Sequence, residues 1–422
     1  MTVKGGVIAP ATVRTIPSLF VQFVLFGLIV NSVIGSAVGL LNLLDPASPW
    51  GDYSKVVDTI LVVVAAIGLL WRDRVRVTPF LALALAVVAL GTGVGILSGG
   101  EPRYFISHLF SGIFIAVLYW FGYNADLRGA ALERWVSRFS TWVVGAYVAV
   151  MAVFWGIFVV RGGSLFLGVA GGDLALPFVY YAVRRRWWLA ALPALLVFAS
   201  GKRSTSLVIL FVFVLLASAR FARGLTRNVA LAGMILGALV IVGFASLQLV
   251  DPVLLPAGLN AIVGKWELLN PLGAEFDPGI GSSGRTAEIE WALARFVGDD
   301  WWRWIVGLGY GWSYFNGAII PGIGTREFYS HYVHFSPLNF LFLYGLPLAV
   351  AFFVLLWGEL AAAYGWILRH TGTRSIERIV AVAAVAALAQ GLSGYAYGSD
   401  PLLWLLLGLA TGARPSDAHP RA

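Results

Sequence analysis

Two adjacent cations, Lys202 and Arg203, stand directly before an apolar run, and the hydroxyls of Ser204, Thr205 and Ser206 follow them. The amino-terminal end of a helix carries a partial positive charge, so cations there are unfavourable unless an anion binds beside them. Free backbone N–H groups and hydroxyls at such an end also bind phosphate oxygens. The stretch therefore predicts an anion-binding site. The alternative is that Lys202 and Arg203 extend to lipid phosphates.

A second arginine, Arg285, stands in the same unfavourable position. It opens a stretch whose apolar residues recur at helical spacing, and Ser283 is a candidate N-cap. Guanidinium groups bind phosphate oxygens through two parallel hydrogen bonds, and a diphosphate has enough oxygens for two arginines. Arg203 and Arg285 together predict a diphosphate clamp. The alternative for Arg285 is an ion pair with Glu288 or Glu290.

Two of the five histidines, His331 and His334, lie three residues apart. Histidine titrates near neutral pH, so either is a candidate general base. If the stretch is helical, this spacing places both side chains on one face. The alternative is a structural histidine at the membrane surface. With Glu327 they resemble a metal site, but the sequence lacks an H-E-x-x-H pattern and a further ligand nearby, so no metal ion is expected.

Other common kinds of site are excluded by the sequence. The chain has no cysteine, so it has neither a thiolate nucleophile nor a disulfide. The glycine-rich turn at 307–312 contains G-x-G-x-G, but no strand precedes it, which argues against a dinucleotide site. No cofactor is expected.

The elements that must position these residues are membrane helices. Hydrophobic residues make up 59% of the chain and charged residues 12%, whereas a soluble protein carries about 25% charge. The mean hydropathy is +0.84. We therefore expect an all-α integral membrane protein. About twelve transmembrane helices are predicted, at 19–44, 56–70, 79–97, 105–121, 141–160, 174–183, 187–199, 205–217, 229–250, 335–357, 379–394 and 402–412.

The charges predict which loops share a side of the membrane. With the N-terminus in the cytoplasm, alternation places arginine clusters such as those at 72–76, 184–186 and 369–378 inside, as the positive-inside rule requires. Asp58, Asp173 and Asp400 then fall outside. Lys4 and Arg14 before the first run are typical of a retained signal anchor. Both termini are expected in the cytoplasm.

Three parts of the chain follow from this topology. Residues 1–250 hold nine transmembrane helices, residues 251–334 form a large extracytoplasmic loop that contains helices, and residues 335–422 hold the last three helices and a cytoplasmic tail. The loop is too polar to span a membrane and too rich in tryptophan to be disordered. A helix over 285–297 is predicted within it, with Ile289, Ala292, Leu293 and Phe296 on its apolar face.

Together these features resemble the superfamily of O-antigen ligases and polysaccharide polymerases, which are bacterial membrane glycosyltransferases of the GT-C type. The resemblance covers about residues 172–347. Arg203 in S-G-K-R-S-T at 200–205 and Arg285 in S-G-R-T at 283–286 carry it, together with the G-L-G at 307–309. The family also has a large periplasmic loop between its late helices.

The third part of the resemblance is the exit of the loop. The spacing from His334 to Gly345 is that of the family's His-Asn-x9-Gly pattern. Phe335 replaces the family's Asn, Ser or Gln, and Leu348 replaces its Gly, Thr or Tyr. These departures leave both His331 and His334 open as the base.

The resemblance implies a metal-independent, inverting glycosyl transfer in the bacterial inner membrane, with the active site on the periplasmic face. The donor is a glycan on undecaprenyl diphosphate. Arginines hold the diphosphate, and a histidine deprotonates the hydroxyl of an acceptor glycolipid. The expected catalytic residues are His334, Arg285 and Arg203. The expected substrate-binding residues are Lys202, His331, Ser204 and Tyr310.

The resemblance leaves the acceptor open. A polymerase adds the glycan to a lipid-linked repeat unit, whereas an O-antigen ligase transfers it to the lipid A core. The broken ligase pattern at Phe335 and Leu348 and the stretch at 202–206 favour an exopolysaccharide polymerase. A flippase for the same lipid is the alternative from another class, and it predicts internal repeats and buried charges in the spans. The sequence shows neither internal repeats nor a run of buried carboxylates.

Overall fold

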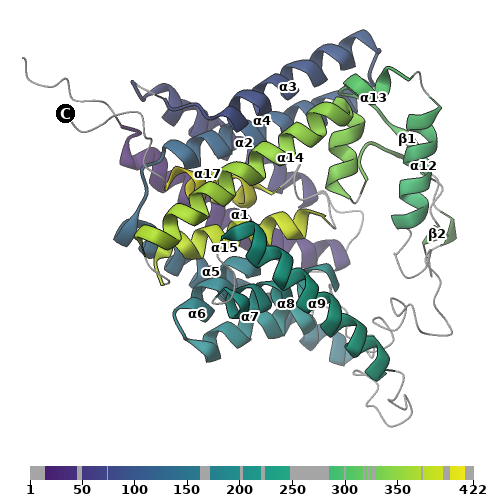
Figure 1. Ribbon diagram of the computed structural model, residues 1–422. Helices are drawn as coiled ribbons and strands as arrows, with labels where there is room; N and C mark the ends of the chain where they lie inside the picture. The colour runs from purple at the N-terminus through teal and green to yellow at the C-terminus, as the bar shows by residue number, and fades with distance from the viewer. Residues whose placement is uncertain are drawn as a thin grey trace, which may run out of the picture.

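The structure is a computed structural model of the 422-residue chain. It describes residues 15–44, 50–73, 75–161, 172–199, 203–219, 224–247, 285–298, 301–316, 319–320, 324–325, 328–333, 335–371, 374–392 and 400–413. Figure 1 shows a bundle of long helices with a smaller group of elements, α12, α13 and the short strands, beside it.

Within the described residues, each of the twelve predicted apolar runs falls in a helix apart from one residue at the start of two of them, whereas 248–250 and 393–394 lie outside these residues. By length and composition, six helices of the described chain are able to cross a membrane, and four shorter apolar stretches accompany them. The structure therefore supports an α-helical membrane protein, while twelve spans remain a prediction. The helices are α1 (Ser18–Leu44), α2 (Trp50–Leu70), α3 (Pro79–Leu97), α4 (Pro102–Asn124), α5 (Gly129–Arg161), α6 (Ala175–Val183), α7 (Trp187–Ala199), α8 (Arg203–Ser218), α9 (Leu225–Leu247), α14 (Ser336–His370), α15 (Ile376–Leu392) and α17 (Pro401–Gly412), and the 3₁₀ turn η1 (Gly172–Leu174) precedes α6.

Local chemistry sets several of these boundaries. Thr78 caps α3 by accepting a hydrogen bond from the Leu81 N–H at 3.1 Å, and Pro79 occupies the first helical position, where no N–H is needed. α5 begins well before the predicted run because its first turns are amphipathic and charged, so hydropathy alone did not reveal them.

α14 is two helical segments rather than one straight span. Gly345 has φ +77° and ψ 167°, a conformation that only glycine adopts without strain, and Pro347 follows it. The short helix α13 (Arg303–Val306) packs against this kink. A Cβ at Gly345 would overlap the backbone carbonyl of Ile305. The first segment of α14 therefore turns away from the rest of the helix (Figure 1).

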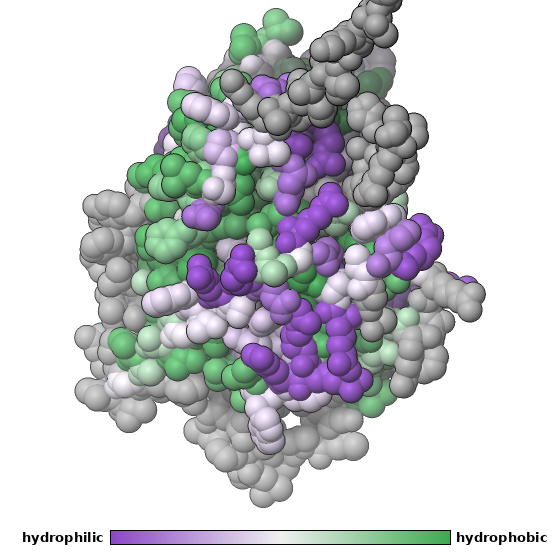
Figure 2. All heavy atoms as spheres, turned by 90° about the vertical axis from the view of Figure 1, so that its left-hand side faces the viewer, coloured by the Kyte–Doolittle hydropathy of each residue, from purple (hydrophilic) through white to green (hydrophobic). Residues whose placement is uncertain are grey.

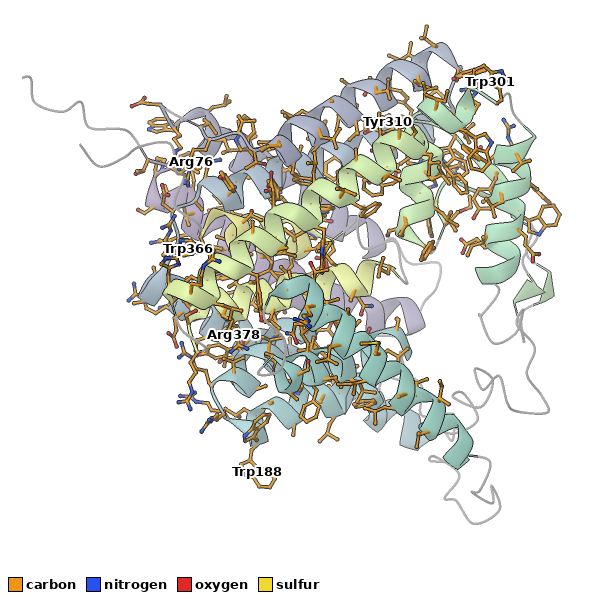
Figure 3. The ribbon with its side chains drawn as sticks, in the orientation of Figure 1. Arg76, Trp188, Trp301, Tyr310, Trp366 and Arg378 are labelled. Atoms are coloured by element: carbon orange, nitrogen blue, oxygen red, sulfur yellow. The ribbon has the colours of Figure 1, made fainter. Side chains whose placement is uncertain are left out.

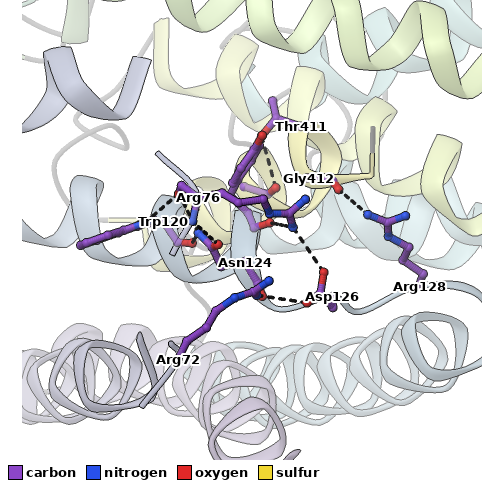
Figure 4. Close-up of polar contacts among 10 residues, drawn as sticks. Arg72, Arg76, Trp120, Asn124, Asp126, Arg128, Thr411 and Gly412 are labelled. Atoms are coloured by element: carbon purple, nitrogen blue, oxygen red, sulfur yellow. Dashed lines mark hydrogen bonds and ion pairs between the residues drawn. The ribbon is translucent and has the colours of Figure 1, made fainter. Parts of the chain in front are cut away.

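Arginines gather at one end of the bundle, which we call the arginine end. Arg72 and Arg76 each form an ion pair with Asp126, at 3.0 and 3.2 Å. Arg128 donates to the Gly412 carbonyl at the end of α17 (Figure 4). Figure 2 views this end and shows hydrophilic side chains gathered across it. The turns after α2, α4 and α17 therefore meet, in agreement with the alternation that the charge pattern predicts.

The opposite end, which we call the loop end, carries the elements between α9 and α14. The helix α12 (Arg285–Val297) has the predicted bounds, and Ala292 and Phe296 on its predicted apolar face are buried. Strand β1 (Tyr314–Asn316) pairs antiparallel with β4 (Phe328–Ser330), and β2 (Ile319–Ile320) pairs with β3 (Gly324–Thr325). The all-α prediction missed these strands because runs of two or three residues are too short to show alternation.

Candidate functional site

Both predicted clamp arginines begin helices, as expected. Arg203 is the first residue of α8, and Arg285 is the first residue of α12. Their side chains, and the whole of Lys202 and His334, lie outside the described part of the structure. The clamp itself therefore remains a prediction, whereas the helix ends that it requires are present.

The hydroxyls after Arg203 face the interior of the protein. Ser204 is half-buried, and Thr205 and Ser206 are buried. The Gln390 amide near the end of α15 donates to the Thr205 hydroxyl at 3.2 Å. The Thr205 hydroxyl is therefore directed towards α15 rather than towards lipid.

His331 packs on the first turns of α4 at the loop end. Its ring stacks on Tyr104, with centroids 4.6 Å apart, and its Nε2 lies 3.2 Å from the Ser107 hydroxyl. His331 follows β4 in a bend, and residues 332–333 are not helical. The helix that would place His331 and His334 on one face is therefore absent over 331–333.

Both backbone polar groups of Val333, the residue before His334, are bound by one side chain. Asn339 in α14 is buried, accepts a hydrogen bond from the Val333 N–H at 2.8 Å, and donates to the Val333 carbonyl at 2.5 Å. A side-chain amide that pairs with both backbone groups fixes the chain locally. Asn339 therefore constrains the direction in which the chain enters His334.

His108 was missed by the sequence analysis, although it joins two parts of the loop to α4. It is 1% exposed. Its Nδ1 accepts a hydrogen bond from the Gly311 N–H at 3.1 Å, so the proton of the neutral ring lies on Nε2, 2.8 Å from the His331 carbonyl. A histidine within an apolar run is an unusual residue, and this was the available signal.

Tyr310 anchors the glycine-rich turn between α3 and α4. Its side chain is fully buried, and its ring lies against Gly91 and Gly112. Its hydroxyl lies 3.1 Å from the Tyr344 hydroxyl. Figure 3 shows Tyr310 between the helices at the loop end. This burial favours a packing role for Tyr310 over the direct substrate contact that the sequence suggested.

A buried tyrosine connects the first turn of α12 with the segment around His331. The Tyr314 hydroxyl lies 3.2 Å from Oε1 of Glu288 and 3.0 Å from the Tyr332 carbonyl. Burial, and then the Glu288 carboxylate, raise the pKa of Tyr314 above its usual value, so the hydroxyl stays protonated and donates. Movement of the start of α12 is therefore coupled to movement of the His331 segment.

Replacing Tyr314 with phenylalanine is expected to lower the free energy of unfolding by about 1–3 kcal/mol, because the buried Glu288 loses a donor. Hydrogen exchange over 285–298 and 328–333 should rise together. Glu288→Gln, which keeps an acceptor at this position, is the matched control. An increase confined to one of the two segments would show that Tyr314 does not couple them.

A second polar group consists of three carboxylates that are distant in sequence, namely those of Asp58, Asp173 and Asp400. Because α17 ends at the arginine end, Asp400 at its start lies towards the loop end. There its side chain caps the helix by accepting hydrogen bonds from the Leu402 and Leu403 N–H groups at 2.9 and 3.2 Å. Burial, then the charge of Asp173, then that of Asp58, raise the pKa of Asp400 to about 7. The sequence analysis missed this group because its members lie on α2, η1 and the start of α17.

The raised pKa predicts how stability depends on pH. The folded protein binds the proton of Asp400 more tightly than the unfolded chain, whose pKa is near 3.8. The stabilising contribution is therefore complete below about pH 3.8 and is lost as the pH rises towards about 7. In Asp400→Asn, which keeps the cap, thermal unfolding in detergent should depend less on pH over this range. An unchanged pH dependence would contradict the assignment.

Among the described residues, no group of three or more histidine or acidic side chains is arranged to hold a metal ion. His334 and Glu327 lie outside these residues. Comparisons of the chain with family models, with curated proteins and with solved structures found no significant match.

Proposed function

We propose that the protein is a membrane glycosyltransferase that extends a bacterial polysaccharide. It transfers a glycan from undecaprenyl diphosphate to a hydroxyl of a lipid-linked repeat unit and inverts the anomeric carbon. The observation that carries the proposal is that Arg203 and Arg285 each begin a helix. A helix start offers free backbone N–H groups beside the arginine, and we infer that the two arginines bind one diphosphate.

The proposed reaction needs only the residues of this chain. The acceptor oxygen attacks the anomeric carbon while the bond from that carbon to the diphosphate oxygen breaks. A histidine, His334 or His331, takes the proton of the hydroxyl. The negative charge that develops on the diphosphate is stabilised by Arg203 and Arg285, with Lys202 and Ser204 beside them. No metal ion or nucleotide takes part.

The location of the fixed parts supports this assignment of roles. Asn339 holds the residue before His334, and Tyr314 connects the first turn of α12 to the chain beside His331. The start of α12, His331 and Val333, the residue before His334, therefore belong to one connected assembly at the loop end. We propose that this end faces the periplasm, with both termini in the cytoplasm, because the arginine end follows the positive-inside rule.

Purified protein in bilayers tests the proposal when it is given a lipid-linked repeat unit alone. A ladder of longer glycans is the expected result and identifies a polymerase. Extension that begins only after lipid A core is added identifies an O-antigen ligase. Loss of extension in the presence of a metal chelator would contradict the metal-independent reaction.

A flippase for the same lipid is the second candidate, and the group of Asp58, Asp173 and Asp400 favours it. Asp58 lies within the predicted span 56–70 on α2, and ionisable residues in membrane helices often belong to proton or substrate pathways. A flippase moves the lipid-linked unit between leaflets and leaves its glycosidic bonds unchanged. Translocation of a labelled repeat unit without any change in its length would therefore select this function.

A further inference from the structure

A cluster of large apolar side chains is exposed at the loop end. It consists of Trp301, Trp302, Trp304 and Ile305, and we call it the tryptophan edge. Trp301 is 76% exposed and Ile305 is 49% exposed. Four such side chains within five residues are unfavourable in water, and contiguous apolar patches of this kind mark surfaces that contact a partner or a membrane.

The backbone of this segment is held in place, so the tryptophan edge cannot fold inwards. Gly307 N–H donates to the Arg303 carbonyl at 2.7 Å, and Leu308 N–H donates to the Phe342 carbonyl at 2.6 Å. The inner side of the segment already has a partner, because Trp304 contacts buried Phe296 edge to face, with centroids 4.7 Å apart. The exposure of the outer side is therefore a property of the fold.

The tryptophan edge continues the apolar surface of α3. This helix is the most apolar of the six helices that are able to cross a membrane, and Leu97 at its last position is 89% exposed. The guanidinium of Arg303 donates to the Ser98 hydroxyl at 2.8 Å, so α13 lies at the level where α3 ends. Figure 3 shows Trp301 beside this end of α3.

The chemistry of the segment is that of the bilayer interface. Tryptophan is enriched where a membrane helix leaves the hydrocarbon, because its large apolar ring carries one N–H donor. Arg303 places its guanidinium over the Trp302 ring, 4.0 Å from the centroid, while it binds Ser98. We propose that the tryptophan edge is seated among the lipid headgroups and holds the loop at a fixed depth in the membrane.

The proposal has a mechanical consequence. α13 leads directly into the turn that inserts Tyr310 between α3 and α4, and then into β1. Contact with lipid at residues 301–305 therefore fixes the side of the loop that borders the bilayer. This inference is independent of the proposed glycosyl transfer and holds for a flippase as well.

Spin labels test the proposal directly, because the chain has no cysteine and each label therefore has a unique site. Trp301→Cys and Ile305→Cys are labelled with a nitroxide in protein reconstituted into bilayers. Glu290→Cys is the matched control, since Glu290 is an exposed carboxylate on neighbouring α12. At each position, the collision rate of the nitroxide is measured with two reagents. One is oxygen, which concentrates in lipid, and the other is a water-soluble nickel chelate.

We expect labels at 301 and 305 to collide several-fold less with the nickel chelate and several-fold more with oxygen than the label at 290. Equal access of the nickel chelate at all three positions would overturn the proposal. Exclusion of both reagents at 301 and 305 would also overturn the proposal, because a protein partner or a second copy would then cover the tryptophan edge. Trp301 is mostly exposed and the second site is independent, so loss of folding in one variant leaves the test intact.

Discussion

Arg203→Ala is expected to lower the rate of glycan extension at least about 100-fold, because removal of one donor to a developing negative charge typically costs that much. The variant should still insert into the membrane, since Arg203 occupies the first turn of α8 and the apolar part of the helix is unchanged. The effect is measured by comparing the rate of glycan extension in membranes that contain the variant with that in membranes that contain an equal amount of the wild-type protein. Arg285→Ala is expected to behave in the same way.

Each arginine has a matched control. Arg295 lies on the same helix as Arg285 but near its end, so Arg295→Ala should retain extension. Arg186 is exposed in the turn between α6 and α7, which belongs to the arginine end, and Arg186→Ala should also be active. Full activity in both Arg203→Ala and Arg285→Ala would refute the diphosphate clamp.

Gly95→Ala is expected to cause the largest loss of stability among single methyl additions on α3. A Cβ at this position would overlap the backbone carbonyl of Tyr310, and backbone cannot move aside as a flexible side chain can. Overpacking of this kind costs about 1–3 kcal/mol. In detergent, the variant should unfold at a lower temperature than the wild-type protein. Protease should also cleave it more readily within 301–333, because the loop detaches from α3.

Gly93 supplies the control two residues earlier on the same helix. Among the described residues, a Cβ there would meet no atom within 4 Å beyond its chain neighbours and the backbone of its own helix. Gly93→Ala should therefore be neutral, or more stable by up to about 1 kcal/mol through helix propensity. Equal stability of the two variants would show that the turn around Tyr310 does not rest on α3 as described.

The helices and both arginine positions were predictable because their signals are local. An apolar run, a hydroxyl cluster or a change of hydropathy lies within a few residues. The bounds of α12 followed from the helical spacing of its apolar residues together with Ser283 as a candidate N-cap. The kink at Gly345 was not predicted, because it depends on the approach of α13 to α14. Local patterns carry no information on such contacts.

The packing of the candidate site was hidden for the same reason. His108 and Gly311 are separated by 203 positions, and Tyr310 fits between helices that lie far before it in the chain. Asp58, Asp173 and Asp400 likewise come from three distant elements. Single residues were visible as candidates, but their assembly required the fold.

The most direct test of the central claim is to count the undecaprenyl diphosphate released and the glycosidic bonds formed when purified protein receives a lipid-linked repeat unit. The proposed reaction releases one molecule of undecaprenyl diphosphate for each bond formed, and Arg203→Ala should lower both in parallel. Transfer of the intact lipid between leaflets, with no diphosphate released and no new bond, would contradict the assignment as a glycosyltransferase.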